Sequence, residues 1–329
     1  MRGFPERGAP TCSIPGNHLR LCRIEVELRP RTCNWRIATE RQKPSESGST
    51  VVVTGAGGLL GRATVDRFTR SGWSVIALDH AQLDITNEDA VRAALESAGP
   101  DLIVNCAATT DVDRCEREPD WAYAANEAGP RFLAQGARRL GAEIVHVSTD
   151  YVFDGEKDGL YTQDDKPNPL SVYASSKLAG ERAVAAETDR HYIARSSWVF
   201  GAGGKNFGSR VIEYARGGAR LKGVMDQESI PTYAPDLAAR IEVLAGLKDY
   251  GLYHVTNTGP TTWYDFARLA LDLAGMGDFH IEPATRKDLK QAAARPRNSA
   301  MRCLKSEAMG LDPLRHWRDA MPEFVGSVT

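Results

Sequence analysis

The chain has 329 residues, of which 42% are hydrophobic and 26% are charged, and its formal net charge is −2. This composition is typical of a folded globular chain and excludes fibrous and wholly disordered proteins. A net charge close to zero also argues against a general nucleic-acid binder or a protein that binds anionic membranes, since both usually have a strongly basic surface.

Residues 1–49 differ from the rest of the sequence. They hold nine Lys and Arg against five Asp and Glu, five of the 17 prolines, and three of the six cysteines (Cys12, Cys22, Cys33). They contain no apolar core of a secretory signal and too many acids for an organelle transit peptide. No run in the chain approaches the roughly 20 apolar residues that span a bilayer. We interpret residues 1–49 as a disordered leader or a misplaced start, before a cytoplasmic domain with free thiols at residues 50–329.

From Thr50 onward, short β-branched runs alternate with amphipathic helical stretches, which predicts a parallel sheet covered by helices on both faces. We expect strands at Val51–Thr54, Ser74–Leu78, Asp101–Asn105, Glu143–Ser148, Tyr192–Val199 and Leu252–Thr256. We expect helices between Leu59 and Gly72 and at Asn87–Ser97, Trp121–Leu140, Tyr173–Ala186, Phe207–Ala215, Pro235–Leu247 and Thr262–Ala274.

This alternation predicts an α/β fold of the Rossmann type, with a doubly wound parallel sheet and a smaller C-terminal lobe that binds substrate. The dinucleotide-binding part is expected at about residues 50–200 and 230–260. The remaining C-terminal segments would form the lobe over a cleft at the carboxyl edge of the sheet, where open α/β folds bind ligands.

A glycine-rich turn follows the first expected strand, with the sequence Val51-Val-Val-Thr-Gly55-Ala-Gly57-Gly58-Leu-Leu-Gly61. Glycines in such a turn let the backbone approach a pyrophosphate, and the N–H groups of the next helix point at the anion. A glycine triplet alone is common in loops. Here a strand precedes it and a helix follows it, so it indicates a dinucleotide site.

Asp79 ends the second expected strand. An acid at that place accepts hydrogen bonds from the adenosine ribose and repels a 2′-phosphate, which favours NADH. The alternative role of Asp79 is to cap a helix or a turn. Arg62 is a candidate partner for a phosphate, so NADPH remains an alternative cofactor. Asp84 and Ile85 are candidates for holding the adenine, by a polar contact and by apolar packing respectively.

A second motif, Tyr173-Ala-Ser-Ser-Lys177, opens an expected helix. Residues four apart share a helix face, so the ammonium group can lie near the phenol and lower its pKa from about 10. Alone this pattern is more often a solvated helix face. Ser148-Thr149-Asp150 follows a buried strand, however, and would bring a hydroxyl into the same cleft. His146, in that strand, is expected to be a core histidine.

In this order and spacing the motifs resemble the extended short-chain dehydrogenase/reductases: Gly55-x-x-Gly58-x-x-Gly61, Asn105-Cys-Ala-Ala, Ser148-Thr149 and Tyr173-x-x-x-Lys177. Within this superfamily, the chain resembles the dTDP-4-dehydrorhamnose reductase family over about residues 50–320. That resemblance rests on the segments Val104 to Pro119, Ser148 to Gly155, Ser197-Trp-Val-Phe200, Asn206-Phe207, Asp226-Gln227, Pro231-Thr232, Arg295-Pro296 and Asn298-Ser299. Residues 1–49 have no counterpart in it.

The resemblance implies hydride transfer from NADPH or NADH to the 4-keto carbon of dTDP-4-dehydro-6-deoxy-L-mannose, which gives dTDP-L-rhamnose. It implies that Tyr173 donates the proton, that Lys177 lowers the pKa of Tyr173 and holds the nicotinamide ribose, and that Thr149 hydrogen-bonds the same substrate oxygen. The substrate-contacting positions are Thr149, Asp150, Trp198 and Asn206, although Trp198 has core packing as its alternative. Asn126 matches the asparagine of a proton relay.

By the same resemblance the pyrophosphate lies along Gly58, Leu59 and Leu60, and the middle of the dinucleotide lies along Ala107, Ala108, Thr109 and Thr110. Two positions depart from the family pattern. Leu59 replaces a common glutamine, which backbone-mediated phosphate binding should tolerate. Ala63 stands where some members carry a glutamate that helps to hold Mg²⁺ between two subunits, so we expect no metal site, and a monomer or a homodimer without a metal bridge.

Two alternatives remain from the sequence. The chain could be another nucleotide-sugar reductase or epimerase of the same superfamily, which would differ mainly after residue 200. It could also be a non-catalytic regulatory subunit, because the β subunit of methionine adenosyltransferase resembles this family and works by binding a partner protein. The intact set of Thr149, Tyr173 and Lys177 favours an enzyme.

Overall fold

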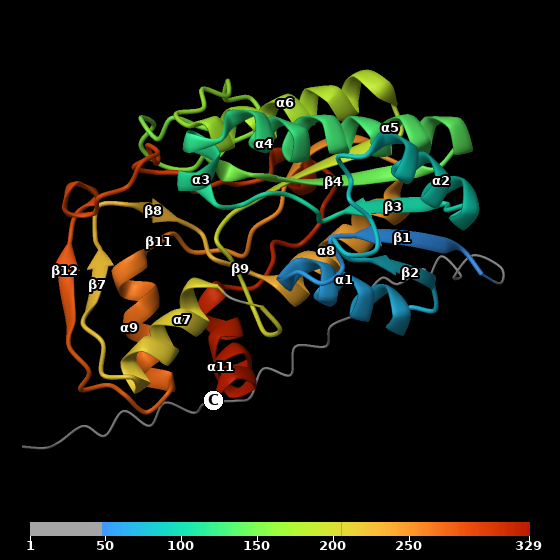
Figure 1. Ribbon diagram of the computed structural model, residues 1–329. Helices are drawn as coiled ribbons and strands as arrows, with labels where there is room; N and C mark the ends of the chain where they lie inside the picture. Colours follow the sequence, from blue (N-terminus) through green and yellow to red (C-terminus); the bar gives the residue numbers. More distant parts are fainter. Residues whose placement is uncertain (1–47, 205) are drawn as a thin grey trace, which may run out of the picture. The chain divides into compact units, whose positions relative to one another are not determined.

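Six parallel strands form one sheet in the order β10-β5-β4-β3-β1-β2 (Figure 1). The computed structural model describes residues 48–204 and 206–329, so residues 1–47 of the expected leader lie outside the described residues. The strands are β1 (Thr50–Thr54), β2 (Ser74–Leu78), β3 (Leu102–Asn105), β4 (Glu143–Thr149), β5 (His191–Ser196) and β10 (Gly251–His254). The strand order reverses between β1 and β3, and such a switch point is where this fold class binds ligands. The doubly wound α/β fold expected from the sequence is therefore confirmed.

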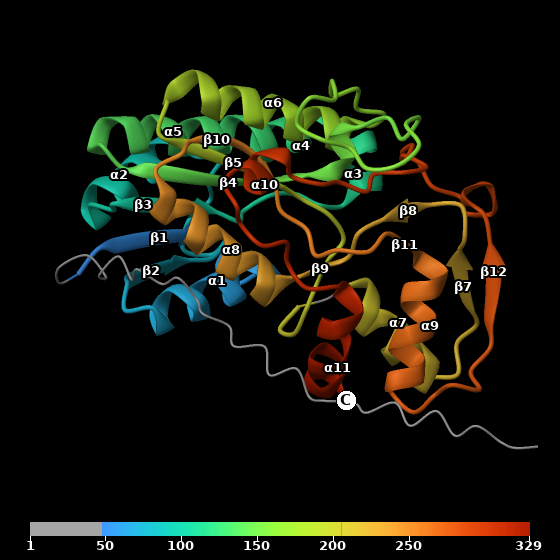
Figure 2. The same cartoon turned by 180° about the vertical axis from the view of Figure 1, so that it is seen from behind.

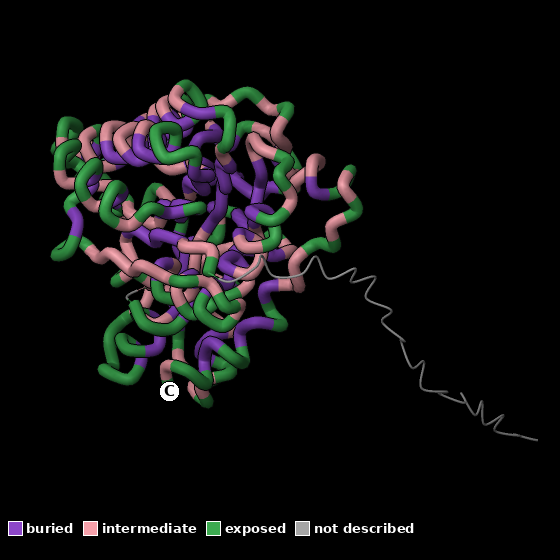
Figure 3. The backbone as a smooth tube through the Cα atoms, turned by 90° about the vertical axis from the view of Figure 1, so that its right-hand side faces the viewer, coloured by how far each residue is buried: buried purple, intermediate pink, exposed green. Residues whose placement is uncertain are grey.

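Helices cover both faces of this sheet (Figures 1 and 2). One face carries α1 (Leu59–Arg70) and α8 (Ala234–Leu247), and the other carries α2 (Glu88–Ala98), α5 (Gly129–Leu140) and α6 (Val172–Glu187). Successive side chains of a strand point to opposite faces. Val51 and Val53 accordingly pack with Phe68 of α1, whereas Val52 packs with Leu95 of α2 and with α5. The four central strands β1, β3, β4 and β5 are therefore largely buried, whereas the edge strands β2 and β10 are only partly buried. Figure 3 shows the buried residues of the interior in purple.

Three helices pack against one another away from the six-stranded sheet: α7 (Phe207–Arg216), α9 (Trp263–Leu273) and α11 (Trp317–Val328) (Figure 1). Their shared core contains Phe200, Phe266, Trp317 and Phe324. Beside them lies a parallel pair, β7 (Leu221–Val224) and β12 (Ile281–Ala284). These segments belong to the part of the chain for which we predicted the smaller lobe.

The remaining elements are short. Two further strand pairs are β6 (Val199–Phe200) with β9 (Thr232–Tyr233), and β8 (Glu228–Ser229) with β11 (Thr261–Thr262). The short helices are α3 (Val112–Arg117), α4 (Pro119–Tyr123), α10 (Leu304–Ala308) and single turns at Asp150–Val152 and Arg286–Asp288. No helix in the described part of the chain is both long and apolar enough to cross a membrane.

The expected strand at Tyr192–Val199 divides in the structure. β5 ends at Ser196, and Trp198 adopts a positive φ of 42°, which is rare for a residue with a side chain. The chain turns there and leaves the large sheet, so that Val199 pairs with Thr232 in a separate sheet. Apolarity alone did not predict this break, because apolar residues resume at Trp198, Val199 and Phe200 directly after it.

The expected helix Trp121–Leu140 is interrupted by a π-helical turn at Ala124–Ala128. Pro130 has no N–H to donate to the carbonyl of Asn126, and the N–H of Gly129 instead reaches the carbonyl of Ala124. The freed Asn126 carbonyl faces α6 so closely that a Cβ at Gly180 would lie 2.0 Å from its oxygen. The interruption thus brings Asn126 against the helix that carries Tyr173 and Lys177.

Candidate active site

The glycine-rich turn after β1 is packed too tightly for side chains. Gly55 has a φ of 66°, and a Cβ there would lie 2.7 Å from the backbone nitrogen of Ala107. A Cβ at Gly61 would lie 2.1 Å from the carbonyl oxygen of Gly55. Gly58 caps α1 without a side-chain hydrogen bond, and the first turn of α1 holds no acid. The turn therefore leaves the positive end of the helix open to an anion, which fits a dinucleotide pyrophosphate.

Asp79 and Arg62 lie on either side of this turn. Oδ1 of Asp79 accepts hydrogen bonds from the backbone N–H groups of Ala81 (2.9 Å) and Gln82 (3.0 Å), so the turn-capping role is present. Oδ2 of Asp79 remains near Gly57. Nε of Arg62 donates to the carbonyl of Gly57 at 2.9 Å, which holds the guanidinium group beside the turn. The ribose contact of Asp79 stays a prediction.

Asp84 and Ile85 follow in the next turn. Oδ1 of Asp84 accepts from the backbone N–H (2.9 Å) and the hydroxyl (2.8 Å) of Thr86, and these hydrogen bonds lower the pKa of Asp84. Ile85 is buried and packs so closely on α5 that a Cβ at Gly129 would lie 2.6 Å from its Cδ1. Both residues therefore have structural roles, and their contact with adenine stays a prediction.

A buried polar network ties together the ends of β1, β3 and β4. Oδ1 of Asn105 accepts hydrogen bonds from the Thr54 hydroxyl (2.7 Å) and the backbone N–H of Ala107 (3.1 Å). Its Nδ2 lies 3.0 Å from Nδ1 of His146. Burial lowers the pKa of His146 well below its usual range, so the ring is neutral, as suits a core histidine. The network fixes the backbone of Ala107 beside the glycine-rich turn.

Asn126 clamps the next part of that loop. Its Oδ1 accepts from the backbone N–H of Thr109 (3.0 Å), and its Nδ2 donates to the carbonyl of Thr109 (3.2 Å) and to the Ser176 hydroxyl of α6 (3.0 Å). Thr109 is buried, whereas Ala108 and Thr110 are exposed. Asn126 thus joins the expected dinucleotide loop to the helix of the Tyr173 motif. Its part in a proton relay stays a prediction.

Thr149 and Tyr173 meet at the carboxyl end of β4. Ser171 caps α6, so Tyr173 and Lys177 lie in the first two turns of that helix, and both are buried. Burial raises the pKa of Tyr173, and the neighbouring Thr149 side chain acts in the opposite direction. We expected Lys177 to lower the pKa of Tyr173, but Lys177 is not among the groups that mainly determine it. The phenol therefore keeps its proton at neutral pH.

Lys177 is held from the strand side. Its Nζ donates to the carbonyl of Val147 at 2.7 Å. Burial lowers the pKa of Lys177 to about 8, while the negative charge of Glu181, one turn further along α6, acts against this change. Glu181 is itself bound by the buried guanidinium of Arg195, with Nε to Oε1 at 2.9 Å and Nη2 to Oε2 at 2.7 Å. The hydrogen bond to Val147 therefore fixes the Lys177 ammonium group against β4, one helical turn after Tyr173.

Asp150 is 2% exposed and is surrounded by hydroxyl groups. Its Oδ1 accepts from Thr149 (3.1 Å), and its Oδ2 accepts from Ser229 (3.0 Å) and Ser299 (2.5 Å). Burial raises the pKa of Asp150 to about 6, and the three hydrogen bonds act against this rise. These hydroxyl groups donate to both carboxylate oxygens, so Asp150 is bound by Thr149 on one oxygen and by two serines on the other. Its contact with substrate stays a prediction.

Beside these groups lies a cavity of about 500 Å³. It connects to Tyr173 through Tyr151, whose ring makes an edge contact with that of Tyr173 at 6.1 Å between centroids. Its other lining residues come from α7 and its cap, β7 and the turn after it, the start of α9, and residues 289–295: Asn206, Phe207, Arg210, Lys222, Val224, Gln227, Trp263, Leu289, Gln291 and Arg295.

Trp198 and Asn206, which we expected to contact substrate, both lie in this region. Trp198 is half-buried and stacks on Trp263, with ring centroids 3.5 Å apart. Asn206 lines the cavity and also caps α7, since its Oδ1 accepts from the N–H of Ser209 (3.2 Å) and its Nδ2 donates to the carbonyl of Gly201 (2.8 Å). The structure brings both residues near the cavity, and each also has a structural role.

Sequence reasoning did not assign the cationic residues of this cavity. Arg295 is bound to Asp113 and Lys222 to Glu282. Arg210 is exposed and forms no ion pair within the described ranges, 48–204 and 206–329. It follows Asn206 by four residues and so lies one helical turn further along. The four-residue spacing could have indicated Arg210 from the sequence, because residues four apart lie on the same face of a helix.

Comparison with known proteins decides the family. Residues 49–329 match the family described as "RmlD substrate binding domain". A dTDP-4-dehydrorhamnose reductase of Streptomyces griseus is 43% identical over 278 residues, which cover 83% of this chain and 91% of that protein. The chain belongs to the RmlD family.

Two further relatives of this RmlD-family chain bear on its chemistry. A crystal structure of dTDP-4-dehydrorhamnose reductase from Bacillus anthracis, in complex with NADP, has a TM-score of 0.82 and 34% identity and covers 84% of this chain and 98% of its own. A probable dTDP-4,6-dihydroxy-2-methyloxan-3-one 4-ketoreductase of Streptomyces antibioticus is 39% identical and covers 83% of this chain and 93% of its own length.

Three observations bear on whether this chain could bind a metal ion. Ala63 stands at the position from which we predicted that the chain has no metal-bridged dimer. In the part of the chain that the structure describes, no group of three or more His, Cys, Asp or Glu side chains is arranged to hold a metal ion. Cys106, Cys115 and Cys303 are free thiols.

Proposed function

We propose that this chain reduces the 4-keto group of dTDP-4-dehydro-6-deoxy-L-mannose to give dTDP-L-rhamnose, with NADPH or NADH as reductant. The burial of Thr149, Tyr173 and Lys177 at the carboxyl end of β4 is the observation that carries the proposal. It lies at the carboxyl edge of a doubly wound sheet, between a glycine-rich dinucleotide turn and a cavity with cationic side chains. The RmlD-family relatives named above support the same reaction.

The residues on this sheet edge fit a dinucleotide. The turn of Gly55, Gly58, Leu59, Leu60 and Gly61 would hold the pyrophosphate through backbone N–H groups. Its close packing requires glycine at positions 55 and 61, where a Cβ would clash with neighbouring backbone. Asp79, Asp84 and Ile85 would hold the adenosine end. Ala107, Ala108, Thr109 and Thr110 would line the middle of the dinucleotide, where Asn105 and Asn126 fix the loop.

When bound, the reduced nicotinamide supplies the hydride for the carbonyl carbon. Tyr173 would donate its proton to the oxygen of that carbonyl, since burial keeps its phenol protonated at neutral pH. Thr149 would turn its hydroxyl to the same oxygen and stabilise the negative charge that develops there. Lys177, held by Val147, would place a positive charge beneath both groups and hold the nicotinamide ribose.

The cavity beside Tyr151 fits the nucleoside diphosphate of the substrate. Arg210, Lys222 and Arg295 would bind the diphosphate, and Phe207 and Trp263 offer aromatic faces for the base. Thr149, Asp150, Trp198 and Asn206 would form the sugar side of the site, with Asp150 acting through Thr149. The segments after residue 200, apart from about 230–260, would together make up this smaller substrate-binding lobe.

The setting of the enzyme follows from its chemistry. We place it in the cytoplasm, where its thiols would stay reduced. It would work as a monomer or a homodimer on a nucleotide sugar, without nucleic acid, membrane or metal ion as a partner.

The proposal is tested with purified protein, NADPH and the 4-keto sugar made in place by the preceding dehydratase and epimerase. We expect loss of NADPH absorbance only when the complete substrate system is present, and dTDP-L-rhamnose as the product by nuclear magnetic resonance. Folded protein that binds NADPH but shows no turnover would instead favour a regulatory subunit.

The 4-ketoreductase relative from Streptomyces antibioticus favours a second candidate, a reductase for a different dTDP-4-keto sugar. The same assay separates the two when dTDP-4-keto-6-deoxy-D-glucose, supplied by the dehydratase alone, is compared with the epimerised sugar. A higher kcat/KM without the epimerase would support this second candidate.

A further inference from the structure

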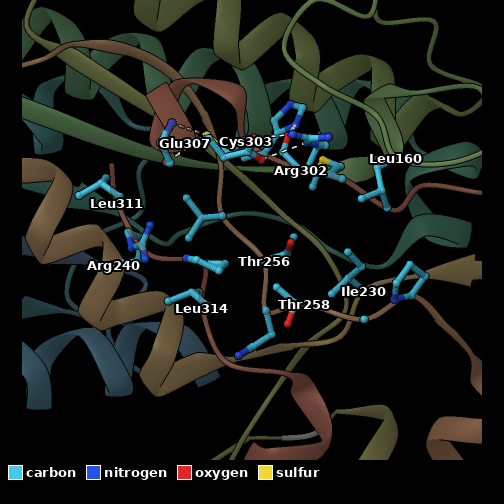
Figure 4. Close-up of a pocket in the computed structure, with 18 residues that line it drawn as sticks. Leu160, Ile230, Arg240, Thr256, Thr258, Arg302, Cys303, Glu307, Leu311 and Leu314 are labelled. Carbon is cyan, nitrogen blue, oxygen red and sulfur yellow. Dashed lines mark hydrogen bonds and ion pairs between the residues drawn. The ribbon is translucent and has the colours of Figure 1, made fainter. Parts of the chain in front are cut away.

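A second cavity, of about 340 Å³, lies where β10 ends, between α8, α10 and the segment that leads to α11 (Figure 4). Its lining contains Arg240 of α8, residues 254–260, residues 301–303, Ser306 and Glu307 of α10, and Leu160, Ile230, Leu311, Pro313 and Leu314. Thr149, Tyr173 and Lys177 do not line it. Its volume falls within the range of small-molecule sites.

Arg240 is a cation of this cavity without an ion pair among the described residues. Its guanidinium group is partly buried and donates to the backbone carbonyl of Asp312, and it forms no ion pair with a carboxylate of residues 48–204 or 206–329. Burial lowers the pKa of Arg240. The Cys303 and Asp312 side chains act against this change, but neither forms an ion pair with Arg240. A partly buried cation without an ion pair favours a bound anion.

The other titratable groups of the lining do not supply that anion. Glu307 is bound by Arg302, with Nε to Oε1 at 3.0 Å. His254 is buried, its Nδ1 lies 2.9 Å from the carbonyl of Arg302, and burial lowers its pKa to about 3, so it is neutral. The sulfur of Cys303 accepts from the Gln163 amide at 2.8 Å and from the Ser306 hydroxyl at 3.1 Å. One positive charge therefore remains.

The rest of the lining suits an apolar body with one polar end. Leu160, Ile230, Leu311 and Leu314 line the space. Figure 4 shows Leu311 and Leu314 on the side of Arg240, Leu160 and Ile230 on the opposite side, and Thr256 and Thr258 between the two sides. An apolar pocket with a few convergent polar groups is the usual form of a small-molecule site.

We propose that this cavity binds a small organic anion, with its carboxylate or phosphate on Arg240 and its apolar body among the surrounding leucines. This site is separate from the substrate site proposed above, and it does not depend on which sugar the enzyme reduces.

The wall of the cavity also reaches the candidate active site. Ile230 and Met301 line the cavity, and their near neighbours Ser229 and Ser299 both donate hydrogen bonds to Asp150, which in turn accepts from Thr149. A ligand that shifts either segment therefore changes the hydrogen bonds of Asp150. We expect occupancy of the cavity to alter the KM for the keto sugar, which makes the site regulatory.

Binding is measured by titration calorimetry with two probes, benzoate and phenyl phosphate, which distinguish carboxylate from phosphate recognition. We expect saturable binding of at least one probe and a loss of about tenfold in affinity in Arg240→Gln, the effect of one charge-assisted hydrogen bond. Arg210→Gln is the matched control, because it removes an arginine from the other cavity and should leave probe binding unchanged. Leu314→Trp, which fills the cavity, should abolish binding while Arg240 remains.

The outcomes separate the claims. Absence of binding by both probes, or equal binding by wild type and Arg240→Gln, overturns the site. Loss of binding in Arg210→Gln instead places the probe in the substrate cavity and also overturns it. A probe that binds through Arg240 but leaves the KM unchanged overturns the regulatory coupling. Because the calorimetry needs no turnover, failure of the proposed reductase activity does not affect the test of the site.

Discussion

Thr149 donates a hydrogen bond from its hydroxyl to the buried carboxylate of Asp150, 3.1 Å away. The hydroxyl oxygen of Thr149 also accepts a hydrogen bond from the backbone N–H of Tyr151, at 3.2 Å. Ser229 and Ser299 donate to the other carboxylate oxygen, and Asp150 forms no ion pair with a cation of residues 48–204 or 206–329. We expect Asp150 to orient Thr149. The candidate proton-donating pair therefore depends on a carboxylate that is costly to keep ionised.

Asp150 should make the protein less stable as the pH rises. Burial raises the pKa of Asp150 from 3.8 to about 6, so between these values the folded chain holds a proton that the unfolded chain has lost. This group therefore lowers the free energy of unfolding as pH rises from about 4 to 6, and its full cost is present above pH 6. Asp150→Asn removes that cost, so its stability relative to wild type should increase between about pH 4.5 and pH 7.5 in urea unfolding.

Asp113→Asn is the control for this measurement. Arg295 lowers the pKa of Asp113 to about 2, so Asp113 is ionised in both folded and unfolded chains over most of that pH range. Its effect on the free energy of unfolding should be nearly constant there. A constant difference for Asp150→Asn as well would show that Asp150 is not a costly buried carboxylate.

Glu181 should set the pH at which activity declines on the alkaline side. The charge of Glu181 opposes the burial that lowers the pKa of Lys177 to about 8, as does Cys106, while His146 is neutral and Tyr173 is protonated. Glu181→Gln removes one negative charge, so Lys177 should lose its proton at a lower pH. The alkaline limb of kcat/KM against pH should move to lower pH.

The control for this profile is Glu187→Gln, at the end of the same helix, where Glu187 pairs with Arg138 at the surface. It should leave the alkaline limb in place. An unchanged limb in Glu181→Gln would mean that Lys177 does not govern that part of the profile, whereas a uniform fall in rate at every pH would indicate only a structural role for Glu181.

Gly61 should be indispensable for cofactor binding. A Cβ at Gly61 would lie 2.1 Å from the carbonyl oxygen of Gly55, so Gly61→Ala must displace the turn that we assign to the pyrophosphate. We expect at least about a tenfold weaker NADPH affinity by fluorescence titration. In Gly246→Ala, where a Cβ meets no atom within 4 Å, we expect unchanged affinity and a melting temperature at or above that of wild type. Equal NADPH affinity in the two variants would contradict the pyrophosphate assignment.

Asp79 should discriminate between the two cofactors. Its Oδ1 caps the turn, and its Oδ2 near Gly57 is the negative charge that a 2′-phosphate would meet. Asp79→Asn should raise the ratio of kcat/KM for NADPH over NADH by roughly tenfold, because a like-charge pair at about 4 Å costs on the order of 1 to 4 kcal/mol near a surface. An unchanged ratio would restrict Asp79 to capping the turn.

Periodicity predicted the large sheet closely, because strands buried on both faces and amphipathic helices have distinct patterns. β2 begins and ends at the expected residues, and α6 extends one residue beyond the expected helix at each end. The break at Trp198 and the π-helical turn before Pro130 were not predicted, since the first depends on a rare φ and the second on one missing N–H.

The candidate site was only partly predictable. The motifs identified Thr149, Tyr173 and Lys177, because each lies next to a strand end or helix start that is visible in the sequence. Arg210 and Trp263 come from other segments, and only the tertiary packing of α7 and α9 shows that they share a cavity. Local motifs also could not show that Asp150 is saturated by Ser229 and Ser299, which lie far along the chain.

The most direct test of the account compares Tyr173→Phe with wild type in the coupled assay, together with NADPH affinity for both. If Tyr173 donates the proton to the 4-keto oxygen, the variant should bind NADPH as wild type does and lose about 10²- to 10⁴-fold in kcat. Wild type should consume one NADPH for each dTDP-L-rhamnose formed. A Tyr173→Phe variant that turns over at nearly the wild-type rate would contradict the account.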